Sequence, residues 1–216
     1  MNINTVLLIV IIANVLFSLK GLNDYSFFEK YKFQIGGIQQ GQKIRMLTSG
    51  FLHADYMHLG MNMYVLYIFG PAVIQQLGEI PFLMVYFGSL FIGNLLTLKY
   101  HHKELYYSAV GASGAVAGVI FSGILLHPDM RLMIFPIPIY LPSYVFGIGC
   151  LLYSIVGMKK QLGNVGHSAH LGGAIGGYVL TLILNPSVFS NNLNIVLLIG
   201  APIVLLLIFG KRLEKL

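Results

Sequence analysis

The chain has 216 residues, of which 56% are hydrophobic and only 9% are charged, and its formal net charge is +6. A soluble domain usually carries about a quarter of charged residues, so this composition excludes an ordinary soluble protein and predicts a polytopic membrane protein. The basic residues are spread over several loops, as residues flanking a bilayer are, and this spread excludes a nucleic-acid-binding face.

Seven segments approach the roughly 20 apolar residues that a membrane-spanning helix needs. They lie at residues 4–20, 51–70, 80–98, 111–126, 138–156, 168–184 and 193–210. The first has no basic segment before it and no clear small-residue cleavage site, so we interpret it as a retained span. The sequence predicts an all-α membrane helix bundle in a single domain over residues 1–216, with six helices in a core of residues 1–185 and one extra C-terminal helix at 193–210.

Two connecting segments differ from the rest in composition. Residues 21–50 mix aromatic side chains with lysines, which is typical of a loop at the level of the lipid headgroups. Residues 127–142 contain four prolines, which disfavour a helix interior, and this segment is predicted to be a loop. Cys150 is the only cysteine and forms no internal disulfide.

Four polar side chains interrupt the apolar spans. His58 and Asn62 lie in the second span, Ser113 at the start of the fourth and His170 near the start of the sixth. Consecutive spans alternate in direction, so these three spans run the same way and the four side chains fall toward one side of the bilayer. Polar groups in a membrane are costly and are functional candidates by default.

Ser113 and His170 have the residue types of a nucleophile and its base. Ser113 lies among small residues, which let another chain approach its hydroxyl, and the free N–H groups of a helix start can stabilise a developing oxyanion. His170 can accept the serine proton and return it to a leaving amine. Glycines at 114 and 118 of the fourth span and at 173 and 177 of the sixth predict close contact between these helices.

His58 and Asn62 are spaced i,i+4 and therefore share one helical face. Their N–H groups are candidate donors to the oxyanion of a tetrahedral intermediate, and the alternative is a role in helix–helix hydrogen bonding. Every acidic residue falls in a loop, at a span edge or in the tail, so we predict a Ser–His dyad without a third acidic member. His167 is expected to be solvated at the start of its helix.

These residues form an ordered set of motifs that resembles the rhomboid family of intramembrane serine proteases. The resemblance runs from about Arg45 to about Gly177. The matching segments are Arg45-Met46-Leu47-Thr48 followed by Phe51-Leu52-His53, then His58-x-x-x-Asn62, Gly111-Ala112-Ser113-Gly114, and Ala169-His170-x-x-Gly173-x-x-x-Gly177. Each motif is weak alone, and their order on alternate spans makes them specific together.

The resemblance implies a serine endopeptidase with Ser113 as nucleophile and His170 as general base. It implies that His58 and Asn62, with the Ser113 N–H, surround the oxyanion, and that His53 is structural. It implies no cofactor and no metal. The substrates would be single-span membrane proteins with a helix-destabilising stretch and a small residue at the cut. The chain would be a multi-pass protein of a membrane, which we expect to be a bacterial cell (inner) membrane.

Three positions depart from the family pattern. The position four residues after Ser113, where the family often has an aromatic residue that stacks on the catalytic histidine, holds Ala117. The glutamate often found after the second span, near Leu77, is absent, and the tryptophan before Arg45 is replaced by Ile44. The first departure bears on catalytic rate, because another group must orient His170.

The charges conflict with the topology that the resemblance implies. If the N-terminus is cytosolic, the outward-facing loops and tail hold twelve of the thirteen basic residues and only Arg131 faces inward. Cytoplasmic loops normally carry the excess of Lys and Arg. Three explanations stay open at this stage: the rule fails here, a span is miscounted, or the orientation is reversed.

Two other functions fit parts of the sequence. The first is a non-catalytic rhomboid-like protein that binds and escorts membrane helices, although inactive relatives typically lose the serine or histidine that this chain keeps. The second is a metal transporter or sensor, since imidazoles bind zinc. Its candidate ligands are His53, His58, His167 and His170. The sequence leaves the oligomeric state open.

Overall fold

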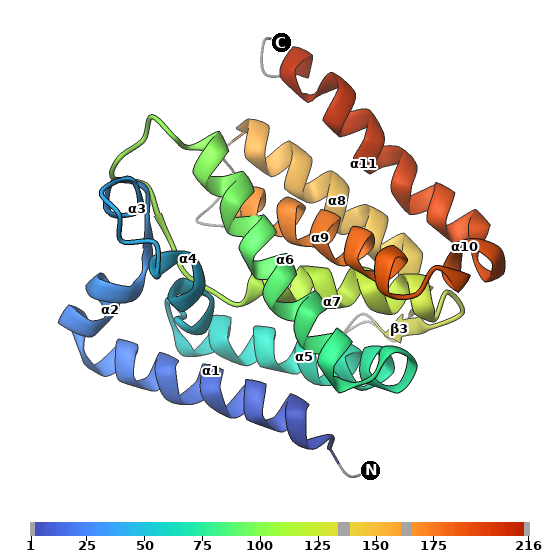
Figure 1. The fold of residues 1–216 in the computed structure, drawn as a ribbon, viewed down its shortest axis with the longest axis horizontal. Coiled ribbons are helices and arrows are strands. Elements are labelled where there is room, and N and C mark those ends of the chain that lie inside the picture. Colours follow the sequence, from blue (N-terminus) through green and yellow to red (C-terminus); the bar gives the residue numbers. More distant parts are fainter. Residues whose placement is uncertain (1–2, 134–138, 161–165, 214–216) are drawn as a thin grey trace.

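The computed structural model describes residues 3–133, 139–160 and 166–213, and in this part of the chain all seven predicted spans are helical (Figure 1). The long helices are α1 (Thr5–Asn23), α5 (Tyr56–Leu77), α6 (Glu79–Tyr100), α7 (Ser113–Leu126), α8 (Ser143–Lys160), α9 (His167–Leu184) and α11 (Leu193–Leu213). The all-α prediction is confirmed. The start of α1 and the end of α11 lie on opposite sides of the molecule.

Short elements connect the long helices. The helical ones are α2 (Tyr25–Tyr31), α3 (Ile35–Gln39), α4 (Arg45–Thr48), the 3-10 turn η1 (Ser49–Phe51) and α10 (Ser187–Asn191). Strand β1 (Phe33–Gln34) pairs antiparallel with β2 (Ser108–Ala109), with Phe33 opposite Ala109. Strand β3 (Arg131–Met133) pairs with β4 (Tyr140–Pro142) within the proline-rich segment, of which residues 134–138 lie outside the described part.

Two predicted helix starts were wrong by about five residues. The second span begins at Tyr56 rather than at residue 51, because the Asp55 carboxylate accepts the His58 N–H at 2.7 Å and caps the helix there. His58 therefore lies in the first turn of α5. The fifth span begins at Ser143 rather than at residue 138, because Tyr140–Pro142 pairs as a strand with β3.

Helix α7 is the centre of the bundle and packs against α5, α6, α8 and α9. It has only 14 residues and so spans about 21 Å, which is short of the ~30 Å hydrocarbon core of a bilayer. Among the described residues, α1, α5 and α6 are long and apolar enough to cross a membrane on length and composition alone. Because other helices surround α7, it needs no full lipid-facing length of its own.

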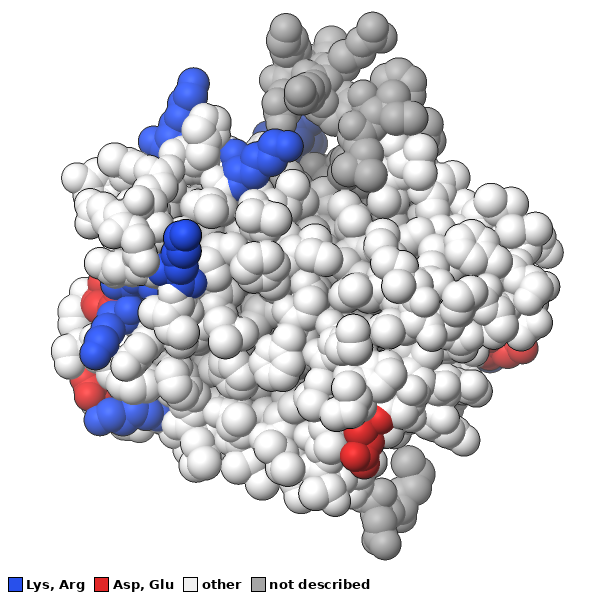
Figure 2. Space-filling view, in the orientation of Figure 1, with Lys and Arg blue, Asp and Glu red and all other residues white. Residues whose placement is uncertain are grey.

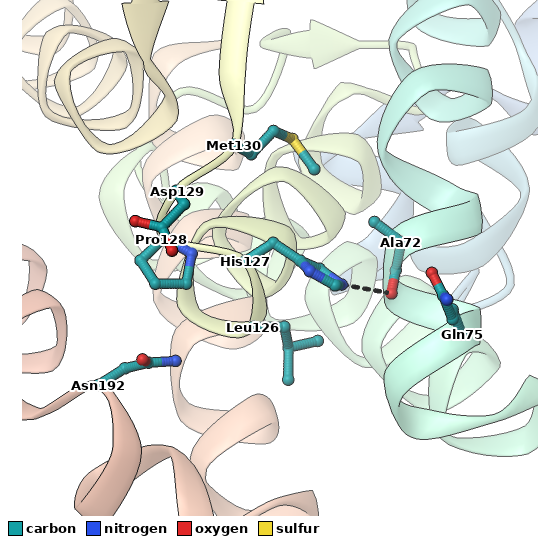
Figure 3. A pocket seen from close by; sticks show the side chains of 8 residues that line it. All are labelled: Ala72, Gln75, Leu126, His127, Pro128, Asp129, Met130 and Asn192. Atoms are coloured by element: carbon teal, nitrogen blue, oxygen red, sulfur yellow. Dashed lines mark hydrogen bonds between the residues drawn. The ribbon is translucent and has the colours of Figure 1, made fainter.

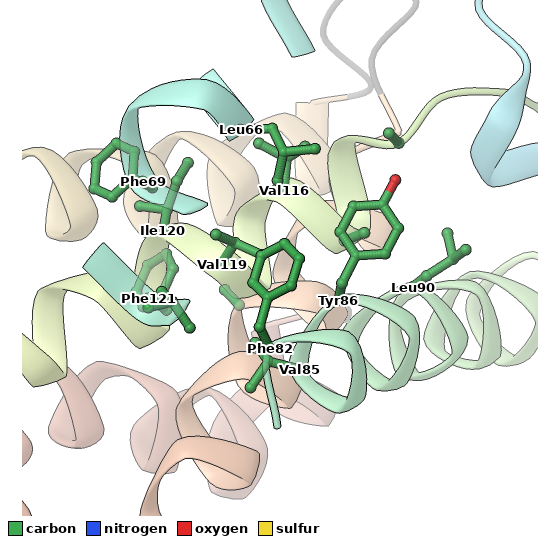
Figure 4. Packing of buried hydrophobic residues seen from close by; sticks show 14 of the residues in the cluster. Leu66, Phe69, Phe82, Val85, Tyr86, Leu90, Val116, Val119, Ile120 and Phe121 are labelled. Atoms are coloured by element: carbon green, nitrogen blue, oxygen red, sulfur yellow. The ribbon is translucent and has the colours of Figure 1, made fainter. Parts of the chain in front are cut away.

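Figure 4 shows the apolar packing around α7. Phe69 of α5 and Phe82 and Tyr86 of α6 are buried against Val119 and Ile120 of α7. Lipid tails are as apolar as these side chains, so it is the fit between them rather than the hydrophobic effect that favours helix association in a bilayer. This packing fixes α7 between α5 and α6.

Glycines line the contact between α7 and α9, as predicted. A Cβ on Gly177 would collide with the Gly118 backbone, and one on Gly173 would collide with the Gly114 carbonyl. Such contacts require the two backbones to approach without intervening side chains. The first turns of α7 and α9 are thereby held side by side.

The charged side chains divide between the two ends of the bundle. Figure 2 shows Lys and Arg gathered along the left and upper edges of a largely uncharged face. Among the described side chains, the basic residues at the Ser113 end are Lys20, Lys30, Lys32, Lys43, Arg45, Lys99, Lys103, Lys159 and Lys160. The opposite end has Arg131, Glu79 and Asp129.

The glycine contact between α7 and α9 makes a prediction about stability. Gly177→Ala should lower the free energy of unfolding by about 1–3 kcal/mol, because its methyl group meets backbone that cannot move aside. Gly149→Ala is the matched control, since a Cβ there meets nothing within 4 Å; it should be neutral or stabilising by up to ~1 kcal/mol. Unfolding in detergent micelles measures both, and equal stability of the two variants contradicts the close packing.

The charge distribution predicts the orientation in the membrane. The test uses single-cysteine variants in a Cys150→Ser background and an impermeant maleimide on intact bacterial cells. We expect Lys43→Cys to be protected and Asp129→Cys to be labelled, because the end of the bundle that is rich in Lys and Arg should face the cytoplasm. Both positions are exposed in the structure, so both should react after the cells are permeabilised. The reverse pattern in intact cells means that the positive-inside rule fails for this chain.

Candidate active site

Ser113 begins α7 after a non-helical segment whose last residue, Ala112, is buried. The Gly111 N–H donates to the Ser49 carbonyl at 3.0 Å, and the Ala112 N–H donates to His53 Nε2 at 3.3 Å. Since α7 is shorter than the bilayer core, at least one of its ends must lie within the apolar layer. Irregular backbone at such depth is tolerated where protein or a cavity surrounds it, and here α4, η1 and α5 supply that surrounding.

Gly111 makes room for both His58 and Ser113. Its φ is +130°, a region that favours glycine. A Cβ at this position would lie 2.8 Å from His58 Nε2 and 3.6 Å from Ser113 Oγ. The His58 imidazole and the Ser113 hydroxyl therefore both border the space beside Gly111.

His170 lies in the first turn of α9, beside the first turn of α7. A Cβ on Gly114 would be 3.2 Å from the carbonyl oxygen of Ala169, the residue before His170. Ser113 and His170 are both half-buried. In the described part of the chain no hydrogen bond joins their side chains.

His167 is buried, so the prediction of a solvated position was wrong. Its exposed fraction is 4%, because α8 covers it: its ring lies edge-on to Tyr153, with 5.0 Å between ring centroids. The His170 ring lies nearly perpendicular to the His167 ring, with 6.4 Å between ring centroids. Tyr153 of α8 and His167 thus form a row of rings that leads to His170.

His58 and Asn62 lie on one face of α5, as predicted. The His58 ring stands edge-on to the His53 ring, with centroids 4.9 Å apart. The Asn62 amide donates one hydrogen to the His58 carbonyl at 3.0 Å, which is a bond within its own helix. An amide carries two N–H donors, so the second stays free for another acceptor.

Sequence reasoning missed the polar residues that hold the segment before Ser113. Ser18 of α1 contacts His53, and Asn94 of α6 donates to the Met46 carbonyl at 2.7 Å and to Ser49 Oγ at 3.3 Å. A signal was present for α1, since Asn14 and Ser18 are spaced i,i+4 within an apolar span. Both are fully buried.

Two other features of the described residues lie apart from this constellation. No group of three or more His, Cys, Asp or Glu side chains is arranged there to hold a metal ion, so the metal hypothesis gains no ligand set. A polar pocket of about 520 Å³ lies at the other end of α7 (Figure 3). There His127 contacts the Ala72 carbonyl at 3.2 Å, far along the helix from Ser113.

Comparison with known proteins gives a consistent family assignment. The family model for the rhomboid domain matches residues 40–187. The mitochondrial Rhomboid protein 1 of Saccharomyces cerevisiae is 31% identical over 138 residues, which cover 62% of this chain and 40% of that protein. The rhomboid protein YdcA of Bacillus subtilis (strain 168) is 35% identical over 147 residues, which cover 68% of this chain and 70% of that protein.

A human relative extends the comparison. The mitochondrial presenilin-associated rhomboid-like protein of Homo sapiens is 35% identical over 140 residues, 61% of this chain and 35% of that protein. The chain thus spans less than half the length of the yeast and human relatives. The matched region contains the histidine and serine motifs, the glycine contact and the first turns of α7 and α9. With its helical membrane architecture and these motifs in order, the chain belongs to the rhomboid family.

Proposed function

We propose that this chain is an intramembrane serine endopeptidase that cleaves membrane-spanning segments of other proteins. Ser113 is the nucleophile, His170 the general base, and His58 and Asn62 are the oxyanion donors. The observation that carries the proposal is the glycine contact of α7 and α9, which sets the helix starts bearing Ser113 and His170 next to each other. The His58 ring beside Gly111 completes the arrangement.

The proposed reaction needs only these side chains and water. Ser113 Oγ attacks the carbonyl carbon of the scissile peptide while its proton passes to the His170 imidazole. His58, Asn62 and the Ser113 N–H donate to the resulting oxyanion. The C–N bond breaks as His170 gives the proton to the leaving amine. Water then attacks the acyl-enzyme, returning the carboxyl product and the Ser113 hydroxyl.

The helical state of membrane-spanning segments limits which substrates the protease could cleave. A helical peptide bond is shielded by its own helix, so a substrate segment must partly unwind before Ser113 reaches it. We therefore propose single-span membrane proteins with a helix-destabilising stretch and a small residue at the cut. We also propose that residues 1–216 form one domain, in which α11 is added to a six-helix core. We propose that the protein lies in a bacterial cell membrane. The relatives come from mitochondria and from a bacterium.

The reactivity of Ser113 distinguishes the protease from the alternative, a helix-binding protein without catalytic activity. We expect a fluorophosphonate serine probe to label the detergent-solubilised chain, and Ser113→Ala and His170→Ala each to lose that labelling, because an isolated serine hydroxyl is a weak nucleophile. Both variants should keep the unfolding temperature of the wild type within a few degrees. A folded wild type that does not react contradicts the protease proposal and favours the helix-binding function.

The support of His170 by His167 can be tested separately. His167→Ala should slow labelling by the probe severalfold, because it removes the ring between Tyr153 and His170. His167→Phe keeps a flat ring of similar size and should retain most of the rate. If both variants react at the wild-type rate, the row of rings does not orient the base.

A further inference from the structure

A chain of hydrogen bonds joins α1 to the residue before the nucleophile. Ser18 Oγ and His53 Nδ1 are 2.7 Å apart, and the Ala112 N–H donates to His53 Nε2 at 3.3 Å. The Ser18 hydroxyl also donates a hydrogen bond to the Phe51 carbonyl at 2.8 Å. Ser18, His53 and Ala112 are all fully buried.

The direction of every bond in this chain follows from one fixed donor. A backbone N–H can only donate, so the Nε2 atom that receives the Ala112 N–H carries no hydrogen. Neutral His53 then carries its hydrogen on Nδ1 and donates it to Ser18 Oγ. Ser18 in turn gives its own hydrogen to the Phe51 carbonyl. Each of the three hydrogens has one acceptor, so the chain is satisfied in one tautomer.

The same imidazole also borders the oxyanion side of the candidate site. The His53 ring packs edge-on against His58, with 4.9 Å between centroids. Ala112 is the N-cap residue of α7, and its own N–H donates to His53. His53 therefore contacts both the backbone before Ser113 and the ring of a proposed oxyanion donor.

We propose that Ser18 is a positioning residue that holds His53 in the Nδ1–H tautomer, so that His53 Nε2 fixes the Ala112 N–H and with it Ser113. The expected effect of Ser18 on catalysis rests on the proposed protease function. The tautomer of His53 does not depend on that function. In the absence of the Ser18 hydroxyl, the Nδ1 hydrogen has no acceptor. The Nε2–H tautomer then competes, and its hydrogen points at the Ala112 N–H instead of accepting from it.

Asn14 provides a matched control on the same helix. It lies one turn before Ser18, is equally buried, and also ties α1 to the bundle, since its amide donates to the Tyr86 hydroxyl of α6 at 3.0 Å. It has no bond to His53. If Ser18 acted only by attaching α1, Asn14→Ala and Ser18→Ala would have the same effect on the site.

The test combines reactivity with a direct reading of the tautomer in the full chain. We expect Ser18→Ala to lower the maximal rate of fluorophosphonate labelling on the order of tenfold, with little change in the probe concentration for half-maximal rate, because a buried bond at the nucleophile is lost. Ser18→Thr keeps the hydroxyl and should recover most of the rate. Asn14→Ala should react nearly as the wild type does, whatever its unfolding temperature.

Nitrogen-15 NMR of histidine-labelled protein, assigned with His53→Gln, reports the tautomer without any catalysis. The wild type and Asn14→Ala should show the Nδ1–H form at His53, and Ser18→Ala should show a mixture or the other form, with faster exchange of the Ala112 amide. An unchanged tautomer in Ser18→Ala overturns the inference, as does equal slowing by Asn14→Ala. If the wild type proves unreactive, the protease proposal fails while the spectrum still decides the role of Ser18.

Discussion

The close approach of α7 and α9 is the contact on which the rest of the site depends. Gly114 and Gly118 face Ala169, Gly173 and Gly177 with no side chain between the backbones. In a bilayer the hydrophobic effect does not drive helices together, so shape complementarity of this kind must supply the association. The contact fixes two helix starts, and each start carries one member of the proposed dyad.

A short central helix is the second consequence of this packing. Because α5, α6, α8 and α9 enclose α7, it can stop before the membrane surface at the Ser113 end. The backbone that completes the crossing is irregular, and its polar groups would be costly in lipid. Two of its N–H groups, those of Gly111 and Ala112, donate to the Ser49 carbonyl and to His53, and Asn94 donates to the Ser49 hydroxyl. The polar groups of the loop are thus bonded to the helices around it, and this network surrounds the nucleophile.

The basic side chains of the described residues gather at one end of the helix bundle. The Ser113 end holds nearly all of the described basic side chains, several of them on α1, α6 and α8 where those helices end. Two of the lysines are paired locally, Lys20 with Asp24 and Lys32 with Glu29. The other described lysines at this end are exposed. The arrangement favours an orientation in which the site opens toward the compartment that retains positive loops.

Hydropathy and small-residue spacing alone predicted the membrane helix bundle and the glycine contact between α7 and α9, both of which are confirmed, and named the candidate residues of the site. Hydrophobic length, small-residue spacing and the alternation of helices are properties of the chain that packing does not change. The helix starts near Asp55 and Ser143, the burial of His167 and the bonds of Ser18, Ser49 and Asn94 became visible only in the packed fold. These features depend on which side chain meets which partner across separate elements, and the spacing of residues along the chain does not identify those partners.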